Sequence, residues 1–360
     1  MVLEYMKVPE EEAVYVGHPE LKALVSAVFQ RLGMPQEEAD IAADVLVLAD
    51  LRGVDTHGVS HNPRVNYVPG LREGRINPRP QVRIVRETPA TALLDGDRGM
   101  GHVVAYRAME VAIRKAREAG GAFVSVRNST HLGMAAYFAM MALPHDMIGI
   151  AISNSPPSVL PLYGRENMLG TNPLSVAAPA KEEPPFVLDM ATSTVAMGKV
   201  WLAQRLGVPL RLGWAADAEG RPVTDPQVAA EARRLLPLGG ERETGGHKGY
   251  GLAVMVDILC GVLSGYGYGS ILPPRTHAHL LAAINISAIQ PAEEFKEMMD
   301  RMIRALRSTP KAAGHDRIWV AGEPEHEILQ ERLVKGIPLQ RQVVDYWNHL
   351  ARELGIERQL

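Results

Sequence analysis

Short runs of β-forming residues alternate with helix-like segments through the middle of the chain, and this alternation most constrains the fold. From about residue 82, six runs have the length and residue types of strands: Val82–Val85, Thr91–Leu94, Phe123–Val126, Ile148–Ser153, Leu174–Ala178 and Phe186–Leu188. Helical periodicity falls between them at Val103–Glu118 and Ala135–Leu143. Such alternation predicts an α/β layer architecture. Because some of the strands are joined by loops too short for a crossover helix, we expect a mixed sheet.

Both ends of the 360-residue chain are helical in pattern, with apolar residues at helical spacing over 21–32, 39–50 and 342–354. A chain of this length suits two closely packed domains. We therefore expect a helical domain built from residues 1–85 and 308–360, and an α/β domain over residues 86–307. The α/β domain should also contain helices over 249–264 and 292–307, a strand over 280–286, and mostly loops over 200–245.

The composition excludes several classes of protein. A net charge of −3 with scattered Lys and Arg gives no electrostatic footprint for nucleic acid or an anionic membrane surface. The most hydrophobic stretch, 249–263, contains Asp257 and is shorter than the ~20 residues that cross a bilayer, so it is interpreted as a buried helix. The N-terminus lacks the pattern of a secretory signal, and we expect a cytoplasmic protein.

Cysteine and histidine usage gives no sign of a metal site. The single cysteine, Cys260, excludes an intramolecular disulfide, and its apolar surroundings are typical of a buried thiol. The 12 histidines form no H-E-x-x-H motif, so we expect no bound metal. A serine hydrolase is disfavoured because no G-x-S-x-G motif is present.

The polar segment that follows residue 52 is dense in groups that can do chemistry. His57 lies beside a glycine, and an accessible histidine can titrate near neutrality, as a general acid or base must. Arg64 offers the planar fork that binds a carboxylate through two hydrogen bonds. The alternative, a capped helix end with polar surface residues, stays open on composition alone.

Two further segments place polar residues directly after strand-like runs. Residues 128–134 lie between a predicted strand and a predicted helix, where α/β proteins often place ligand-binding loops, and they contain His131. His131 could donate a proton to a carbonyl or orient a nicotinamide, or it could be a structural histidine. Asp189 could hold a histidine tautomer, accept from a ribose hydroxyl, or cap a helix.

The glycine clusters do not match a standard phosphate-binding fingerprint. Glycines at 96, 99 and 101 have the reverse of the G-x-G-x-x-G order, and no P-loop motif is present. Each cluster is more simply explained as a turn. At 245–251, however, Lys248 precedes an expected helix, where its charge and the helix dipole could meet a phosphate.

The ordered set of these segments resembles the type 2 malate/L-lactate dehydrogenase family, which includes ureidoglycolate, sulfolactate and diketogulonate oxidoreductases and Δ1-piperideine-2-carboxylate reductases. The matching pieces follow one another from about residue 20 to residue 355: RGVDTHG from 52 with Arg64, LDGDRGMGH from 94, NSTHLG from 128, GTNP from 170, LDMATS from 188, Gly198-Lys199, KGYG from 248 and AGEP from 321.

The resemblance implies a homodimer that uses NAD or NADP in a non-Rossmann α/β domain, completed near the subunit boundary by the helical part. It implies acid/base candidates at His57 and His131 and a charge-relay carboxylate at Asp189. The positions that match cofactor binding are Ser155, Asp189, Met190, Ala191, Thr192, Ser193, Lys248, Gly322, Glu323 and Pro324. Substrate binding is assigned to Arg52, Thr56, Arg64, Thr171 and Asn172, and Arg64 is favoured over Arg52 for the substrate carboxylate.

The expected reaction is hydride transfer between a nicotinamide and C2 of a small 2-keto or 2-hydroxy acid, with malate or L-lactate preferred. An arginine must orient the carboxylate, and a histidine must supply or accept the proton. Thr56 stands where many members have serine, which keeps a hydroxyl but adds a methyl group. Three alternatives stay open: a cyclic imino acid reductase, a ureidoglycolate- or sulfolactate-type dehydrogenase, and a ligand-binding protein without catalysis.

Overall fold

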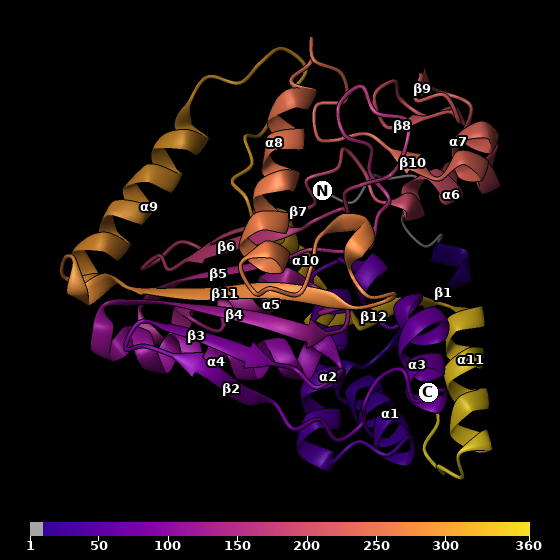
Figure 1. Cartoon of the computed structure of the whole chain (residues 1–360), viewed down its shortest axis with the longest axis horizontal. Coiled ribbons are helices and arrows are strands. Elements are labelled where there is room, and N and C mark those ends of the chain that lie inside the picture. The colour runs from indigo at the N-terminus through magenta and orange to yellow at the C-terminus, as the bar shows by residue number, and fades with distance from the viewer. Residues whose placement is uncertain (1–9) are drawn as a thin grey trace.

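A seven-stranded mixed sheet forms the centre of the computed structural model, which describes residues 10–360 (Figure 1). The strand order is β2-β3-β4-β11-β5-β6-β7, and among the described strands of this sheet only β3 and β4 are parallel neighbours. This confirms the predicted mixed sheet and differs from the parallel sheet of a Rossmann fold. The strands are β2 (Arg83–Glu87), β3 (Thr91–Asp95), β4 (Gly121–Ser129), β5 (Met147–Ser153), β6 (Leu174–Ala178), β7 (Phe186–Met190) and β11 (His277–Asn285).

Helices cover both faces of this sheet. On one face lie α4 (Gly101–Ala119) and α5 (Ala135–Met140), and on the other lie α8 (Gly246–Asp257) and its π-helical continuation η6 (Ile258–Val262). The alternation of side chains along β11 explains the arrangement, since Leu281 packs with the α4 cluster and Leu280 packs with Cys260. The predicted helix over 249–264 is therefore α8 with η6, and Cys260 is buried as expected.

Helices from the two ends of the chain share a second core, as the pattern predicts (Figure 1). Trp347 lies fully buried in it and donates its indole N–H to the carbonyl of Val59. The elements are α1 (His18–Arg31), α2 (Gln36–Leu51), α3 (Val68–Arg72), α10 (Glu323–Lys335) and α11 (Arg341–Glu353), with β1 (Ala13–Val16) paired to β12 (Ile337–Gln340). The division at residues 85 and 308 stays a prediction, and β2 crosses the first of these positions.

Residues 197–235 form small elements where the sequence analysis expected mostly loops. They are α6 (Met197–Leu206), β8 (Ala215–Ala216), β9 (Pro222–Val223), α7 (Pro226–Ala232) and β10 (Arg234–Leu235), and the three strands pair in the order β10-β8-β9. Their brevity and the surrounding Gly and Pro residues hide them from a periodicity argument. Helix α9 (Ala292–Ser308) lies where it was predicted. Within residues 10–360 no helix is both long and apolar enough to cross a bilayer.

Candidate active site

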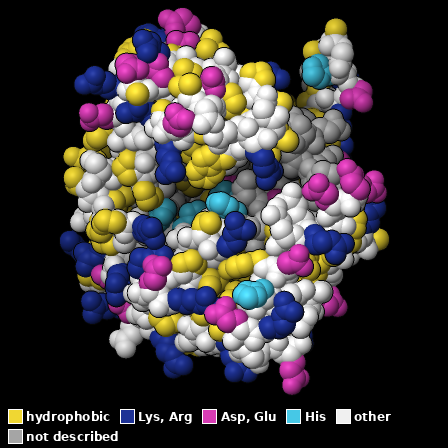
Figure 2. All heavy atoms as spheres, turned by 90° about the vertical axis from the view of Figure 1, so that its right-hand side faces the viewer, with side chains coloured by type: hydrophobic (Ala, Val, Ile, Leu, Met, Phe, Trp, Pro, Cys, Tyr) yellow, Lys and Arg dark blue, Asp and Glu magenta, His cyan; other side chains and the backbone are white. Residues whose placement is uncertain are grey.

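A pocket of about 460 Å³ lies between the sheet, the residues that follow α2 and the chain that leads into α10. Its walls come from the segments 52–57, 131–136, 153–155, 171–173, 187–191 and 319–325, with His277 added from β11. Figure 2 shows a hollow across one face of the molecule in which histidine side chains gather. The volume lies in the range of small-molecule and cofactor sites.

The strand pairing explains why distant segments meet here. His277 begins β11 and pairs with Ser129 at the end of β4, while His279 pairs with Ser153 at the end of β5. Because β11 is antiparallel to both neighbours, its first residues lie at the edge where the other two strands end. The loops that carry His131 and Ser155 leave the sheet at this same edge.

His131 is held by the chain on one side of its ring. Its Nδ1 lies 2.6 Å from the hydroxyl of Tyr67 and accepts a hydrogen bond from the backbone N–H of Gly133 at 3.3 Å. Burial, with further contributions from neighbouring histidines, lowers the pKa of His131 well below its usual range. His131 is therefore neutral at pH 7.

His57 stacks on His131, with ring centroids 5.6 Å apart and planes 21° from parallel. It lies in the 3-10 turn η3 (Asp55–His57), and its Nδ1 is 2.9 Å from the hydroxyl of Thr56. Burial lowers the pKa of His57 to about 4. Thr56 thus places its hydroxyl beside the His57 ring, and the two candidate imidazoles share one pocket.

A third imidazole in the pocket belongs to His277, whose Nδ1 lies 2.8 Å from the carbonyl oxygen of Asn154. Since a carbonyl only accepts, this contact places the proton of neutral His277 on Nδ1. Behind it, His279 lies between the hydroxyls of Ser153 and Ser129, at 2.8 and 2.9 Å. Burial lowers the pKa of His277 to about 4 and that of His279 to about 3, so both are neutral.

Arg52 supplies positive charge to the pocket. It is only 5% exposed, and its Nε has no hydrogen-bond partner among the described residues. Burial lowers the pKa of Arg52, while the carboxylates of Glu325 and Asp189 oppose this shift. A buried guanidinium with an unpaired N–H is costly, and an anionic ligand would relieve that cost.

Asp189, at the end of β7, lies across the pocket wall and accepts a hydrogen bond from the backbone N–H of Ala136 at 2.8 Å. Although the residue as a whole is exposed to the pocket, desolvation of its carboxylate raises the pKa of Asp189 to about 6. Its hydrogen bond goes to the start of α5 rather than to a histidine ring. The charge-relay role that the resemblance implies stays a prediction.

Hydroxyl groups of Ser155 and Thr171 line the pocket 3.3 Å from each other. Asn172 is fully buried behind them, where its Oδ1 accepts from the N–H of Ser155 and its Nδ2 donates to Ala253 O and Asp257 Oδ2. This network ties α8 to the pocket wall. In this structure, Asn172 fixes Ser155 and does not line the pocket itself.

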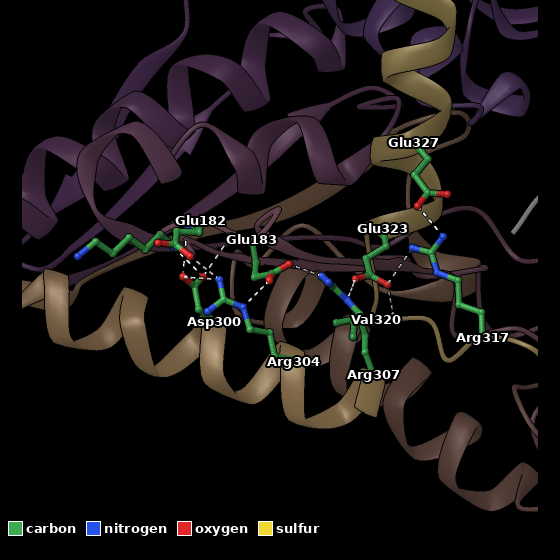
Figure 3. Close-up of polar contacts among 10 residues, drawn as sticks. Glu182, Glu183, Asp300, Arg304, Arg307, Arg317, Val320, Glu323 and Glu327 are labelled. Carbon is green, nitrogen blue, oxygen red and sulfur yellow. Dashed lines mark hydrogen bonds and ion pairs between the residues drawn. The ribbon is translucent and has the colours of Figure 1, made fainter. Parts of the chain in front are cut away.

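The wall formed by residues 319–325 is held by ion pairs (Figure 3). The carboxylate of Glu323 is nearly buried, accepts from the N–H of Val320 at 2.9 Å and pairs with Arg307 of α9. Gly322 has φ +94°, and a Cβ there would lie 2.9 Å from the backbone N of Val187. Gly322 and Pro324 therefore line the pocket, while the carboxylate of Glu323 braces the wall.

The remaining predicted cofactor and substrate residues divide into three groups. Met190 and Ala191 line the pocket, whereas Thr192 and Ser193 are buried behind it and hydrogen-bond to backbone carbonyls. Arg64 and Lys248 are exposed and lie outside the lining. Lys248 is nevertheless in the first turn of α8, and the next residue, Gly249, lies against Leu238, whose backbone N–H donates to the carbonyl of Thr192. The functional roles of all six stay predictions.

Sequence reasoning gave no role to Tyr67, His277, Trp319 or Glu325, although all four belong to the site or contact it. The predicted strand over 280–286 begins three residues too late, so the sequence did not mark His277 as the first residue of β11. Within residues 10–360 no three His, Cys, Asp or Glu side chains are grouped to hold a metal ion.

Comparison with known proteins places the whole chain in one group. The family profile described as malate/L-lactate dehydrogenase matches residues 16–348. A malate dehydrogenase from Pyrococcus horikoshii is 44% identical over 97% of this chain and 98% of its own length, and an L-sulfolactate dehydrogenase from Methanocaldococcus jannaschii is 38% identical over 93% and 96%. A solved structure of the Pyrococcus horikoshii malate dehydrogenase superposes with a TM-score of 0.89, at 41% identity, over 98% of this chain and 99% of that one.

Proposed function

Because this chain belongs to the malate/L-lactate dehydrogenase family, we propose that it interconverts a 2-keto and a 2-hydroxy acid with NAD or NADP, and that its preferred pair is oxaloacetate and malate. The observation that carries the proposal is one pocket that contains two stacked imidazoles and a buried guanidinium whose Nε–H has no partner among residues 10–360. The similarity to a malate dehydrogenase at 44% identity supports the choice of substrate.

The pocket suits a nicotinamide cofactor. Gly322 brings backbone within reach of a ligand where no side chain fits, and Asp189 and the hydroxyl of Ser155 can hydrogen-bond to ribose and amide groups. We assign Met190, Ala191 and Pro324 to the same wall, with Thr192, Ser193 and Glu323 supporting it and Lys248 near the phosphates. When bound, the reduced cofactor supplies the hydride that becomes the C2–H bond of the product.

Arg52 is proposed to bind the substrate carboxylate. It lines the pocket, whereas the exposed Arg64, which sequence reasoning favoured, does not. A guanidinium can donate two parallel hydrogen bonds to a carboxylate, which fixes the direction of C2. Thr56 and Thr171 line the same pocket as Arg52 and are proposed to contact the substrate. Asn172 is proposed to act indirectly, through its hydrogen bond to the backbone N–H of Ser155.

His131 is proposed to give the proton that the carbonyl oxygen takes up as hydride reaches C2, and to accept it in the reverse direction. Its Nδ1 is engaged by Tyr67 and Gly133, which leaves Nε2 for the substrate. An anionic substrate beside the ring favours the imidazolium, so substrate binding raises the pKa of His131 from its low value. His57, stacked alongside, is the second candidate.

The test is a substrate panel followed with each reduced cofactor. We expect NADH or NADPH oxidation with oxaloacetate to exceed that with pyruvate, sulfopyruvate or Δ1-piperideine-2-carboxylate, and NAD(P)⁺ reduction with malate to exceed that with ureidoglycolate. His131→Asn should lower kcat by about 10² or more, the usual contribution of a general acid. Faster turnover of the cyclic imine would favour the reductase alternative. Near-normal turnover in both His131→Asn and His57→Asn would contradict the mechanism.

A homodimer is part of the proposal. Several large apolar side chains are exposed on η6 and the residues after it, with Ile258 50%, Val262 52%, Leu263 61% and Ile271 59% exposed. A single chain rarely leaves such a cluster in water, and a second copy could cover it. A cytoplasmic location, expected from the sequence, stays a prediction.

A further inference from the structure

Tyr67 lies beside the pocket without lining it. It ends the π-helix η4 (Pro63–Tyr67), its ring is fully buried, and the edge of His102 packs against it at a centroid distance of 4.8 Å. Its hydroxyl is directed to a single described group, Nδ1 of His131, at 2.6 Å. A buried hydroxyl that forms its hydrogen bond with one ring nitrogen can determine whether that nitrogen carries a proton.

The N–H of Gly133 shows which protonation is present. A backbone N–H can only donate, so Nδ1 of neutral His131 must carry its lone pair toward Gly133. The hydroxyl of Tyr67 then donates to the same lone pair, in a hydrogen bond shared by two donors, and the single ring proton lies on Nε2. Gly133 has φ +82°, and a Cβ there would lie 2.7 Å from Nε2 of His102, so only glycine keeps this N–H in place.

We propose that Tyr67 is a positioning residue that holds neutral His131 in the tautomer with its proton on Nε2, and that its hydroxyl rotates to accept from Nδ1–H when His131 becomes an imidazolium. The role in catalysis rests on the proposed function, in which Nε2 exchanges the proton with the substrate oxygen. The hydroxyl is suited to this because it can donate in one state and accept in the other.

Among the described groups around His131, Tyr67 is the one placed to stabilise its imidazolium at Nδ1. The groups that act electrostatically on the ring are His277, His57, His102 and His279, all of which disfavour its cation, as burial does. The nearby carboxylate of Asp189 is hydrogen-bonded to Ala136. The hydroxyl of Tyr67 therefore offers the imidazolium its charge-assisted hydrogen bond at Nδ1, which is stronger than a neutral one.

Kinetics of Tyr67→Phe test the catalytic part. We expect kcat for keto-acid reduction to fall about tenfold, with KM within about threefold of normal because Tyr67 does not line the pocket. The alkaline limb of the kcat profile should move to lower pH by about half to one unit, since the imidazolium loses its stronger hydrogen bond. Tyr137→Phe is the matched control: its hydroxyl donates to Asp44 Oδ2 at 2.8 Å, away from His131, and should change neither kcat nor the profile.

Nitrogen NMR of protein labelled with ¹⁵N-histidine tests the tautomer without any turnover. In the native protein, Nδ1 of His131 should have the shift of an unprotonated ring nitrogen, and in Tyr67→Phe the two nitrogens should move toward averaged values. A protonated Nδ1 in the native protein at neutral pH overturns the proposal, as does an unchanged pH profile in Tyr67→Phe. If the protein lacks dehydrogenase activity but shows the Nε2–H tautomer, the proposed function fails while the tautomer assignment holds.

Discussion

Arg52 is buried in the pocket and Arg64 is exposed outside it, and this difference gives the first prediction. Arg52→Lys keeps the charge but loses the planar fork, so KM for the keto acid should rise about thirtyfold, the equivalent of about 2 kcal/mol for one charged hydrogen bond. Arg64→Lys, at an exposed position outside the pocket, should stay within about threefold. Steady-state kinetics at saturating cofactor measures both. A larger effect at Arg64 would restore the assignment made from the sequence.

The raised pKa of Asp189 leads us to expect that cofactor binding depends on pH. Desolvation raises the pKa of its carboxyl to about 6, so the ionised form that accepts from ribose hydroxyls is lost as the pH falls through 6. NADH or NADPH affinity, measured by fluorescence titration, should therefore weaken several-fold between pH 7.5 and 5. In Asp189→Asn the affinity should be lower at pH 7.5 and nearly flat with pH. The same slope in the variant and in the native protein would show that another group titrates.

Many residues of the pocket were predictable as neighbours but not in their orientation, and two predicted residues, Arg64 and Lys248, lie outside the pocket. A motif such as that at 321–324 indicates that Gly322 and Glu323 lie near the ligand, yet only coordinates show that the glutamate pairs with Arg307. The same holds for Asn172, which contacts Asp257 some 85 positions later in the chain. Tyr67 was visible in the sequence, but nothing local connects it to His131.

Helix α10 joins the two walls of the pocket. Its first residues lie in the wall at 319–325, and one of its later residues, Arg332, pairs with Asp55 at 2.5 Å and donates to the carbonyl of Asp50. Asp50 and Asp55 flank Arg52, which is proposed to bind the substrate. Helix α10 therefore connects the segment that contains Arg52 to the wall at 319–325, which is proposed to bind the cofactor. The arginine is 13% and the aspartate 36% exposed at the side chain, which makes the pair partly shielded from solvent.

We expect Arg332→Ala to lower the free energy of unfolding by about 2 kcal/mol, and to raise KM for both keto acid and cofactor. Burial already raises the pKa of Asp50, and Arg332 opposes that shift, so the variant should raise it further. A carboxyl whose pKa is raised in the folded state lowers the free energy of unfolding as the pH rises. The difference in this free energy between Arg332→Ala and the native protein should therefore be larger at pH 8 than at pH 5. Denaturant unfolding at both values measures it.

Lys335→Ala is the control for Arg332. Lys335 pairs with Glu331 on the same helix, but the side chains are 62% and 55% exposed, and such a surface pair contributes little to the free energy of unfolding because solvent screens it. Equal losses in the two variants would mean that Arg332 acts through helix α10 alone and not through the contact with residues 50–55.

Elements with a strong pattern were predictable, and short or mainly polar ones were not. All six predicted strands from 82 to 188 are present, because β-branched and apolar runs bounded by turn residues leave few alternatives. Helix α10 was missed since its sequence is mostly charged and polar, with Glu323 its only buried residue. Helix α6 follows a polar loop and buries only Val200 and Ala203, so it carries little periodic signal.

The assembly gives a prediction for the whole molecule. If a second copy covers η6, Ile258→Glu combined with Val262→Glu should convert a dimer into a monomer, because it places two charges in the apolar contact. Ile289→Glu, at a single apolar residue that is 77% exposed, is the control and should leave the dimer intact. Light scattering coupled to size exclusion measures the mass. A native monomer would contradict the proposed assembly.

The sheet order and the union of the two chain ends belong to the molecule as a whole. The pattern predicted strands and a mixed sheet, but the insertion of β11 between β4 and β5 joins residues more than 120 positions apart. This insertion brings His277 to the site. A local pattern contains no information on such pairing, which is why His277 was not assigned.

Transfer of deuterium tests the central claim most directly. The protein is given oxaloacetate with NADH or NADPH deuterated at C4 on one face or the other, and the malate is analysed by mass spectrometry and NMR. The proposed function predicts that one of the two labelled cofactors places its deuterium on C2 of malate, and that none reaches the solvent. Cofactor oxidation without deuterium at C2, or no malate from either cofactor at any pH between 5 and 9, would contradict it.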